Sequence, residues 1–138
     1  MSDWTKRLKR DVVGMLVGSN DPAISYLARR DLLGERLPGT DPLWNLPDCK
    51  RVIARQRADG SWRYPGGNKK IRSQTNYDQL ETYRQLGILV YRFELNRQHP
   101  AIDRAARFLL SFQSDAGDFR GIYGSQFTPN YSAAITEL

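Results

Sequence analysis

A seven-residue pattern occurs twice in this chain and constrains its fold more than any other feature. The pattern is Gln-x-x-x-Gly-x-aromatic, and its two copies occupy residues 56–62 and 113–119. Each copy follows an apolar run with helical spacing that begins just after a proline, Pro42 or Pro100. A repeated unit of helix and turn predicts a helical-repeat fold, in which neighbouring units bury each other's apolar faces.

Each position of this pattern suits a tight corner between two helices. A glutamine side chain offers both a donor and an acceptor to the unpaired backbone groups at a helix end. Glycine permits the positive φ of a sharp turn, and the aromatic ring can fold back over the glutamine. For either copy alone, an ordinary glycine turn beside a chance aromatic is the alternative. The predicted corner residues are Gln56, Gly60, Trp62, Gln113, Gly117 and Phe119.

Proline and capping signals divide the 138 residues into about six to seven helices with no strand. We therefore expect one all-α domain over residues 1–138, with helices paired as hairpins. Residues 1–18 hold a basic amphipathic helix that could cap an open edge of this domain, and a membrane-surface role is the less favoured alternative.

The stretch 86–91 is apolar on nearly every side and predicts a helix buried on all sides. We expect this helix to line the inside of the fold. The candidate inner surface consists of Tyr83, Leu86, Val90 and Tyr91.

The two corners resemble the QW-type repeats of the squalene–hopene cyclase and protein prenyltransferase β-subunit superfamily. The run 105–112 leads into Gln113 as the outer helices of that superfamily lead into their repeats, and the segments 121–124 and 128–131 resemble its entry into a following helix. The resemblance implies an α/α toroid, a ring of helical hairpins around a cavity. It also implies that this chain, with about half of the usual hairpins, is part of a longer toroid. Because non-enzymatic relatives share that fold, the resemblance does not carry a function with it.

The catalytic motifs of the resembled superfamily are missing from this chain. There is no Asp-x-Asp-Asp acid motif, Asp48 and Cys49 are adjacent rather than spaced, and the single histidine, His99, precedes a proline at a helix start. We expect no catalytic residue, no metal site and no cofactor. The favoured function is a structural module, or one that binds an apolar ligand or partner. The alternative is the N-terminal portion of a terpenoid-cyclase-like or prenyltransferase-like enzyme whose catalytic residues lie outside this chain.

Composition and charge narrow the expected partners. The net charge is +6, but acidic residues are interspersed with the arginines, so nucleic acid and membrane surfaces are not expected. In the loop 65–72, glycines lie beside lysines, a combination that can bind phosphate. The loop lacks the phosphate-loop motif, so we do not expect phosphate binding there. A single cysteine excludes an internal disulfide, and we expect a cytoplasmic location. The expected partners are a second copy, docked through an exposed apolar edge, further toroid repeats, or an apolar small molecule.

Overall fold

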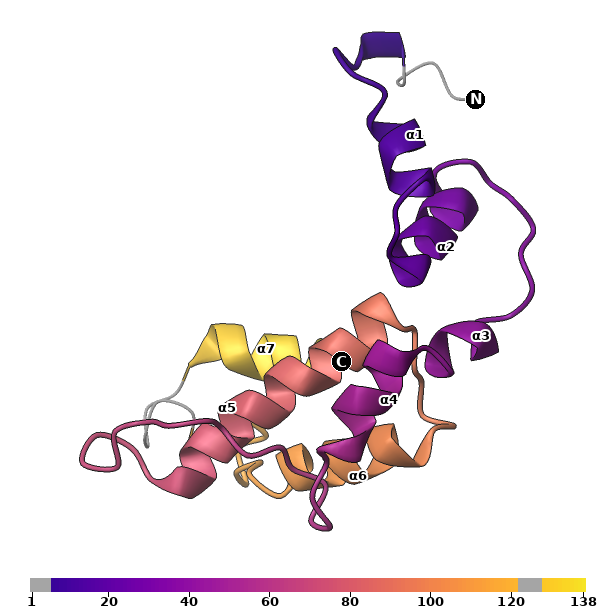
Figure 1. Ribbon diagram of the computed structural model, residues 1–138. Helices are drawn as coiled ribbons and strands as arrows, with labels where there is room; N and C mark the ends of the chain where they lie inside the picture. Colours follow the sequence, from indigo (N-terminus) through magenta and orange to yellow (C-terminus); the bar gives the residue numbers. More distant parts are fainter. Residues whose placement is uncertain (1–5, 122–127) are drawn as a thin grey trace.

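The computed structural model describes residues 6–121 and 128–138, and this part of the chain is all-α (Figure 1). It contains seven α-helices and no strand, so the predicted fold class and number of helices are confirmed. A π-helical turn, η2 (Ile88–Arg92), continues the fifth helix. In chain order the helices are α1 (Val12–Val17), α2 (Pro22–Asp31), α3 (Asp41–Trp44), α4 (Pro47–Ala54), α5 (Gln74–Gly87), α6 (Pro100–Leu110) and α7 (Pro129–Glu137).

Proline and a capping side chain set where several helices begin. Proline lies in the first turn of α2, α4, α6 and α7, where its missing N–H costs no helical hydrogen bond. Asp21 caps α2 by accepting hydrogen bonds from Ala23 N and Ile24 N at 2.9 and 3.3 Å. No helix within the described ranges is both long and apolar enough to cross a membrane.

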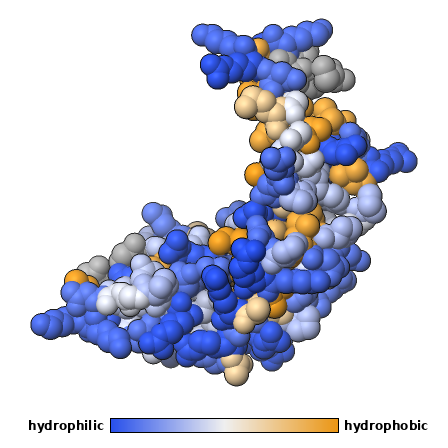
Figure 2. All heavy atoms as spheres, viewed as in Figure 1, coloured by the Kyte–Doolittle hydropathy of each residue, from blue (hydrophilic) through white to orange (hydrophobic). Residues whose placement is uncertain are grey.

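The first helix is shorter than the sequence pattern predicts. It begins at Val12 because the Asp11 carboxylate accepts a hydrogen bond from Gly14 N at 2.8 Å and thereby caps it there. Residues 1–5 of the predicted helix over 1–18, Trp4 among them, lie outside the described residues. α1 packs against α2, and this pair projects away from α4–α7 (Figure 1). Apolar side chains remain exposed on the pair (Figure 2), among them Val12, Met15 and Ile24, and Leu8 is exposed just before α1.

Two ion pairs connect α2 to the segment that follows α5. Arg30 binds the Glu94 carboxylate, and Arg92 binds the Asp21 carboxylate. Burial alone would raise the pKa of Asp21, but the hydrogen bonds from Ile24 N, from Ala23 N and from Arg92 outweigh it and lower that pKa. Asp21 therefore serves twice, as a helix cap and as an ion-pair partner.

The main core lies among α4, α5, α6 and α7. Leu89, Phe93 and Leu109 are almost fully buried there, together with Cys49 from α4. The prediction that stretch 86–91 is buried on every side is wrong: Leu86 and Leu89 are buried, but Ile88 and Tyr91 are exposed, Tyr91 by 58%. Within the described residues, the other core helices cover only one side of this stretch, so its outer side faces solvent.

Candidate functional site

The two predicted corners share one hydrogen-bonded frame. Gln56 and Gln113 lie just beyond the ends of α4 and α6, and each folds its side chain back onto its own corner. The Nε2 of Gln56 donates to Gly60 O at 3.0 Å, and the Nε2 of Gln113 donates to Gly117 O at 3.0 Å. The two glycines have φ values of 88 and 85°, in the left-handed region that favours glycine. The sequence repeat is therefore also a repeat of backbone geometry.

The aromatic residue of each corner lies under this frame and links it to the following helix. Trp62 is 3% exposed and Phe119 is 4% exposed. The backbone N–H of Trp62 donates to Thr82 Oγ1 in α5 at 3.0 Å, and that of Phe119 donates to Ser132 Oγ in α7 at 3.1 Å. Each corner thus fixes one helix relative to the next.

The first corner is closed by the start of α6. Gln56 Nε2 donates a second hydrogen bond to Ala101 O at 2.8 Å, and Arg104 Nη2 donates to Gln56 Oε1 at 2.7 Å. Gly60 is buried, and a Cβ built on it would lie 2.2 Å from Arg104 O. α6 therefore contacts both the amide of the glutamine and the surface of the glycine.

The second corner has the same frame but no helix seated on it in the described part of the chain. Gln113 and Gly117 are both exposed. The nearest atom to a Cβ built on Gly117 is Gln113 Nε2 at 4.0 Å, which belongs to the corner itself. Among the described residues, the Gln113 side chain bonds only to Gly117 O. The surface that α6 covers on the first corner is open on the second.

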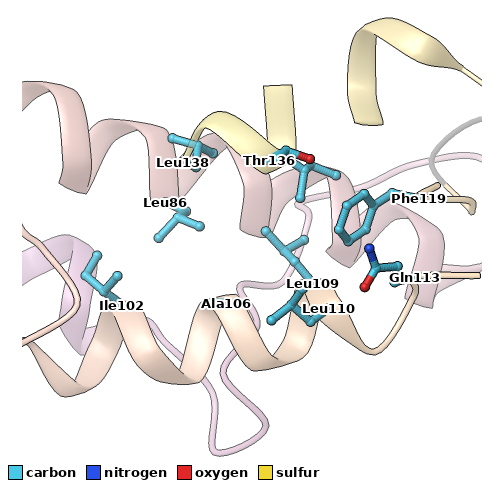
Figure 3. A pocket seen from close by; sticks show the side chains of 10 residues that line it. Leu86, Ile102, Ala106, Leu109, Leu110, Gln113, Phe119, Thr136 and Leu138 are labelled. Carbon is cyan, nitrogen blue, oxygen red and sulfur yellow. The ribbon is translucent and has the colours of Figure 1, made fainter. Parts of the chain in front are cut away.

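An apolar groove starts at this open corner and runs between α6 on one side and α5 and α7 on the other (Figure 3). Its volume is about 250 Å³. Gln113 and Phe119 lie together at one end of it, and Ile102 lies at the other end (Figure 3). Leu110 on its wall is 53% exposed, so the groove is open to solvent. The remaining lining residues are Leu86, Ala106, Leu109, Ile135, Thr136 and Leu138.

The four residues predicted to form an inner surface do not come together in this groove. Of these residues, only Leu86 lines it. Val90 lines an adjoining hollow that shares Ile102, Ala106 and Leu138 with the groove. Tyr83 makes an edge-to-face contact with Tyr131 at a ring-centroid distance of 5.7 Å, and Tyr91 faces solvent. Tyr83, Leu86 and Val90 share one helix face by their spacing, but they lie at successive heights along it, so each meets a different neighbour, while Tyr91 lies on the exposed side.

The groove residues that the sequence interpretation missed come from α6 and α7. Leu109, Leu110 and Ile135 belong to ordinary apolar helix stripes. A stripe shows which side of a helix is apolar, but not whether another helix covers it. The one sequence signal that could have located the groove is the second corner itself, since Gln113 lies at its end.

The buried ionisable groups near the corners have structural partners. Asp78 is 4% exposed, and its carboxylate accepts hydrogen bonds from Arg57 at 2.6 Å, from Gln74 at 2.7 Å and from Tyr64 N at 3.0 Å. These contacts hold the start of α5 against the first corner.

Burial raises the pKa of the Cys49 thiol to about 11. Within the described residues, no group of three or more His, Cys, Asp and Glu side chains is placed to hold a metal ion.

His99 caps α6 by accepting a hydrogen bond from Ala101 N at its Nδ1, at 3.1 Å. Burial, assisted by the nearby Arg104, lowers the pKa of His99, so the folded protein favours the neutral ring that can accept this bond. Because the pKa of His99 is lower in the folded protein, the cap contributes fully to the free energy of unfolding above the ordinary histidine pKa of about 6.5. This contribution is lost as the pH falls through the pKa that His99 has in the folded protein.

We therefore expect the free energy of unfolding to fall by up to about 1 kcal/mol on protonation of His99, the usual worth of a helix cap. Urea unfolding at pH values on both sides of the ordinary histidine pKa measures this loss. In His99→Asn the loss should be absent over the same range, because asparagine caps without titrating. Since His99 is the single histidine of the chain, an equal loss in the variant would contradict this role.

The fold and the two corners define an all-α protein built from a repeated unit of helix, corner and helix. No family model, curated protein or solved structure matches this chain. The resemblance to the cyclase and prenyltransferase toroids therefore rests on the two corner motifs and on the sequence segments that adjoin the second of them.

Proposed function

We propose that this chain is a helical-repeat binding module that holds an apolar partner in the groove between α5, α6 and α7. In this proposal it resembles the terpenoid cyclase and prenyltransferase toroids in architecture and has no catalytic motif of its own. The observation that carries the proposal is the groove, an open hollow of about 250 Å³ with mainly aliphatic walls and one exposed amide, that of Gln113, at its end. Sites that bind apolar ligands combine such walls with a few polar groups that fix orientation.

The polar groups near the groove favour binding over chemistry. Gln113 and Thr136 are the polar residues that line it, and neither titrates in the range where general acids and bases work. The buried carboxylate of Asp78 lies at the other corner and is fully engaged with Arg57, Gln74 and Tyr64. The groove therefore offers apolar contact and one amide that can fix the orientation of a ligand.

An uncharged fluorescent probe, N-phenyl-naphthylamine, tests the proposal without interference from the net charge of +6. We expect saturable binding of one probe per chain. Leu110→Glu should weaken it by about tenfold or more, because a carboxylate on the groove wall must lose water when the probe binds. Leu110 is half exposed in the free protein, so this change should cost little stability.

The matched control is Ile71→Glu, which makes the same chemical change on an isoleucine that is 77% exposed in the loop before α5. Its affinity for the probe should equal that of the unchanged chain. Equal weakening by both substitutions, or probe binding that does not saturate, would show that the groove is not the binding site.

A further inference from the structure

We propose that the second corner, residues 113–119, binds the first turn of a helix from a separate helical-repeat protein. The first turn of that helix has the same kinds of residues as the first turn of α6. This inference rests on the proposed function, because it names the partner that the groove would hold. It starts from the closed first corner, which shows what this frame binds. There, the carbonyl of Ala101 accepts from Gln56, and Arg104 donates back to the same amide.

The second corner presents the same groups in the same arrangement. Gln113 Nε2 is held by Gly117 O at the distance found for Gln56 and Gly60, 3.0 Å. An amide nitrogen carries two hydrogens, so Gln113 can donate a second bond, as Gln56 does to Ala101. Its oxygen can accept from an arginine, as that of Gln56 does from Arg104.

Gly117 provides the space for a close backbone approach. At the first corner, the absence of a side chain on Gly60 lets Arg104 O come within 2.2 Å of where a Cβ would lie. Gly117 has nearly the same positive φ, and its surface is exposed. A helix that approaches Gly117 in this way would extend its later turns along the apolar groove that starts at Gln113.

These contacts define the chemistry of the occupant. It begins with proline followed by a small residue, whose carbonyl faces Gln113, and it carries an arginine one turn after the proline, as Pro100, Ala101 and Arg104 do. A second copy of this chain does not supply such a helix. The Pro-Ala start of α6 is already seated on Gln56, and the Pro-Ala start of α2 has Ala23 fully buried.

The probe for the test is an acetylated and amidated peptide with the sequence of residues 97–112, added to the ¹⁵N-labelled full chain. We expect the side-chain amide resonances of Gln113 and the backbone amide resonance of Gly117 to shift saturably, while those of Gln56 and Gly60 stay in place. A peptide with Arg104→Ala should bind about tenfold more weakly, because it lacks the charged donor to the Gln113 oxygen.

Gly117→Ala in the protein should abolish the shifts, because the new Cβ occupies the space of the approaching carbonyl. The matched control is Gly34→Ala, which also places alanine at a positive φ, 67°, with no atom of the described residues within 4 Å of its Cβ. Gln113→Met provides a second loss-of-binding variant if Gly117→Ala does not fold. It keeps the length of the side chain and removes the amide.

Two results would overturn the inference. One is the absence of shifts at Gln113 and Gly117 up to millimolar peptide, and the other is unchanged binding to both Gly117→Ala and Gln113→Met. If the Gln113 resonances shift with protein concentration when no peptide is present, the corner binds a second copy of this chain. That result would also overturn the inference. If the naphthylamine probe still binds and is sensitive to Leu110→Glu, the proposed function stands while this inference falls. If neither probe nor peptide binds, both fall.

Discussion

Replacing Trp62 with alanine should lower the free energy of unfolding by about 3–5 kcal/mol, the range for removing a large buried aromatic side chain. Trp62 is 3% exposed and belongs to the same core cluster as Leu86 and Leu109. Its Nε1 also donates to Val52 O in the last turn of α4, at 2.8 Å. The substitution therefore leaves a cavity and removes one of the two hydrogen bonds that Val52 O accepts, the other coming from Arg55 N at 3.2 Å. Urea unfolding followed by far-ultraviolet circular dichroism measures the loss.

Trp62→Phe separates these two effects. Phenylalanine keeps much of the apolar area and occupies the equivalent position, Phe119, at the second corner. The variant should lose only about 1–3 kcal/mol, from the missing Nε1 donor and the smaller ring. If Trp62→Ala moves the unfolding midpoint no more than Trp62→Phe, the ring is not buried over the corner as described.

Gly60→Ala should lower the free energy of unfolding by about 2–5 kcal/mol, from positive-φ strain of about 1–2 kcal/mol and overpacking of about 1–3 kcal/mol. The new Cβ would lie 2.2 Å from Arg104 O and 2.6 Å from Arg104 C, and both are backbone atoms of α6. A side chain could rotate away, but α6 must shift as a whole. That shift would also break the hydrogen bonds of Gln56 with Ala101 and Arg104.

Gly117→Ala is the internal control for this prediction. Its φ is 85° against 88° for Gly60, so the backbone strain is the same, but no residue of the described ranges opposes the new methyl group. We expect a loss of about 1–2 kcal/mol from strain alone. Equal losses for the two variants would mean that α6 does not press on the first corner. A larger loss for Gly117→Ala would contradict the open second corner.

The sequence by itself determined the helical class and the two corners, because these depend on groups close together in the chain. Proline can start a helix, and glycine can adopt a positive φ, whatever lies across the interior. For the same reason Gln56 and Gln113 make the same contact with a glycine four residues on, at 3.0 Å in both corners.

The tertiary structure alone decided which corner is closed and which is open. Gln56 meets residues of α6 that are 45 and 48 positions away along the chain, while Gln113 ends an exposed groove. It likewise decided that Tyr91 faces solvent although its stretch is apolar on nearly every side. Apolar periodicity indicates which face of a helix favours burial. That face is buried only where another segment packs against it, and the packing of distant segments decides where that happens.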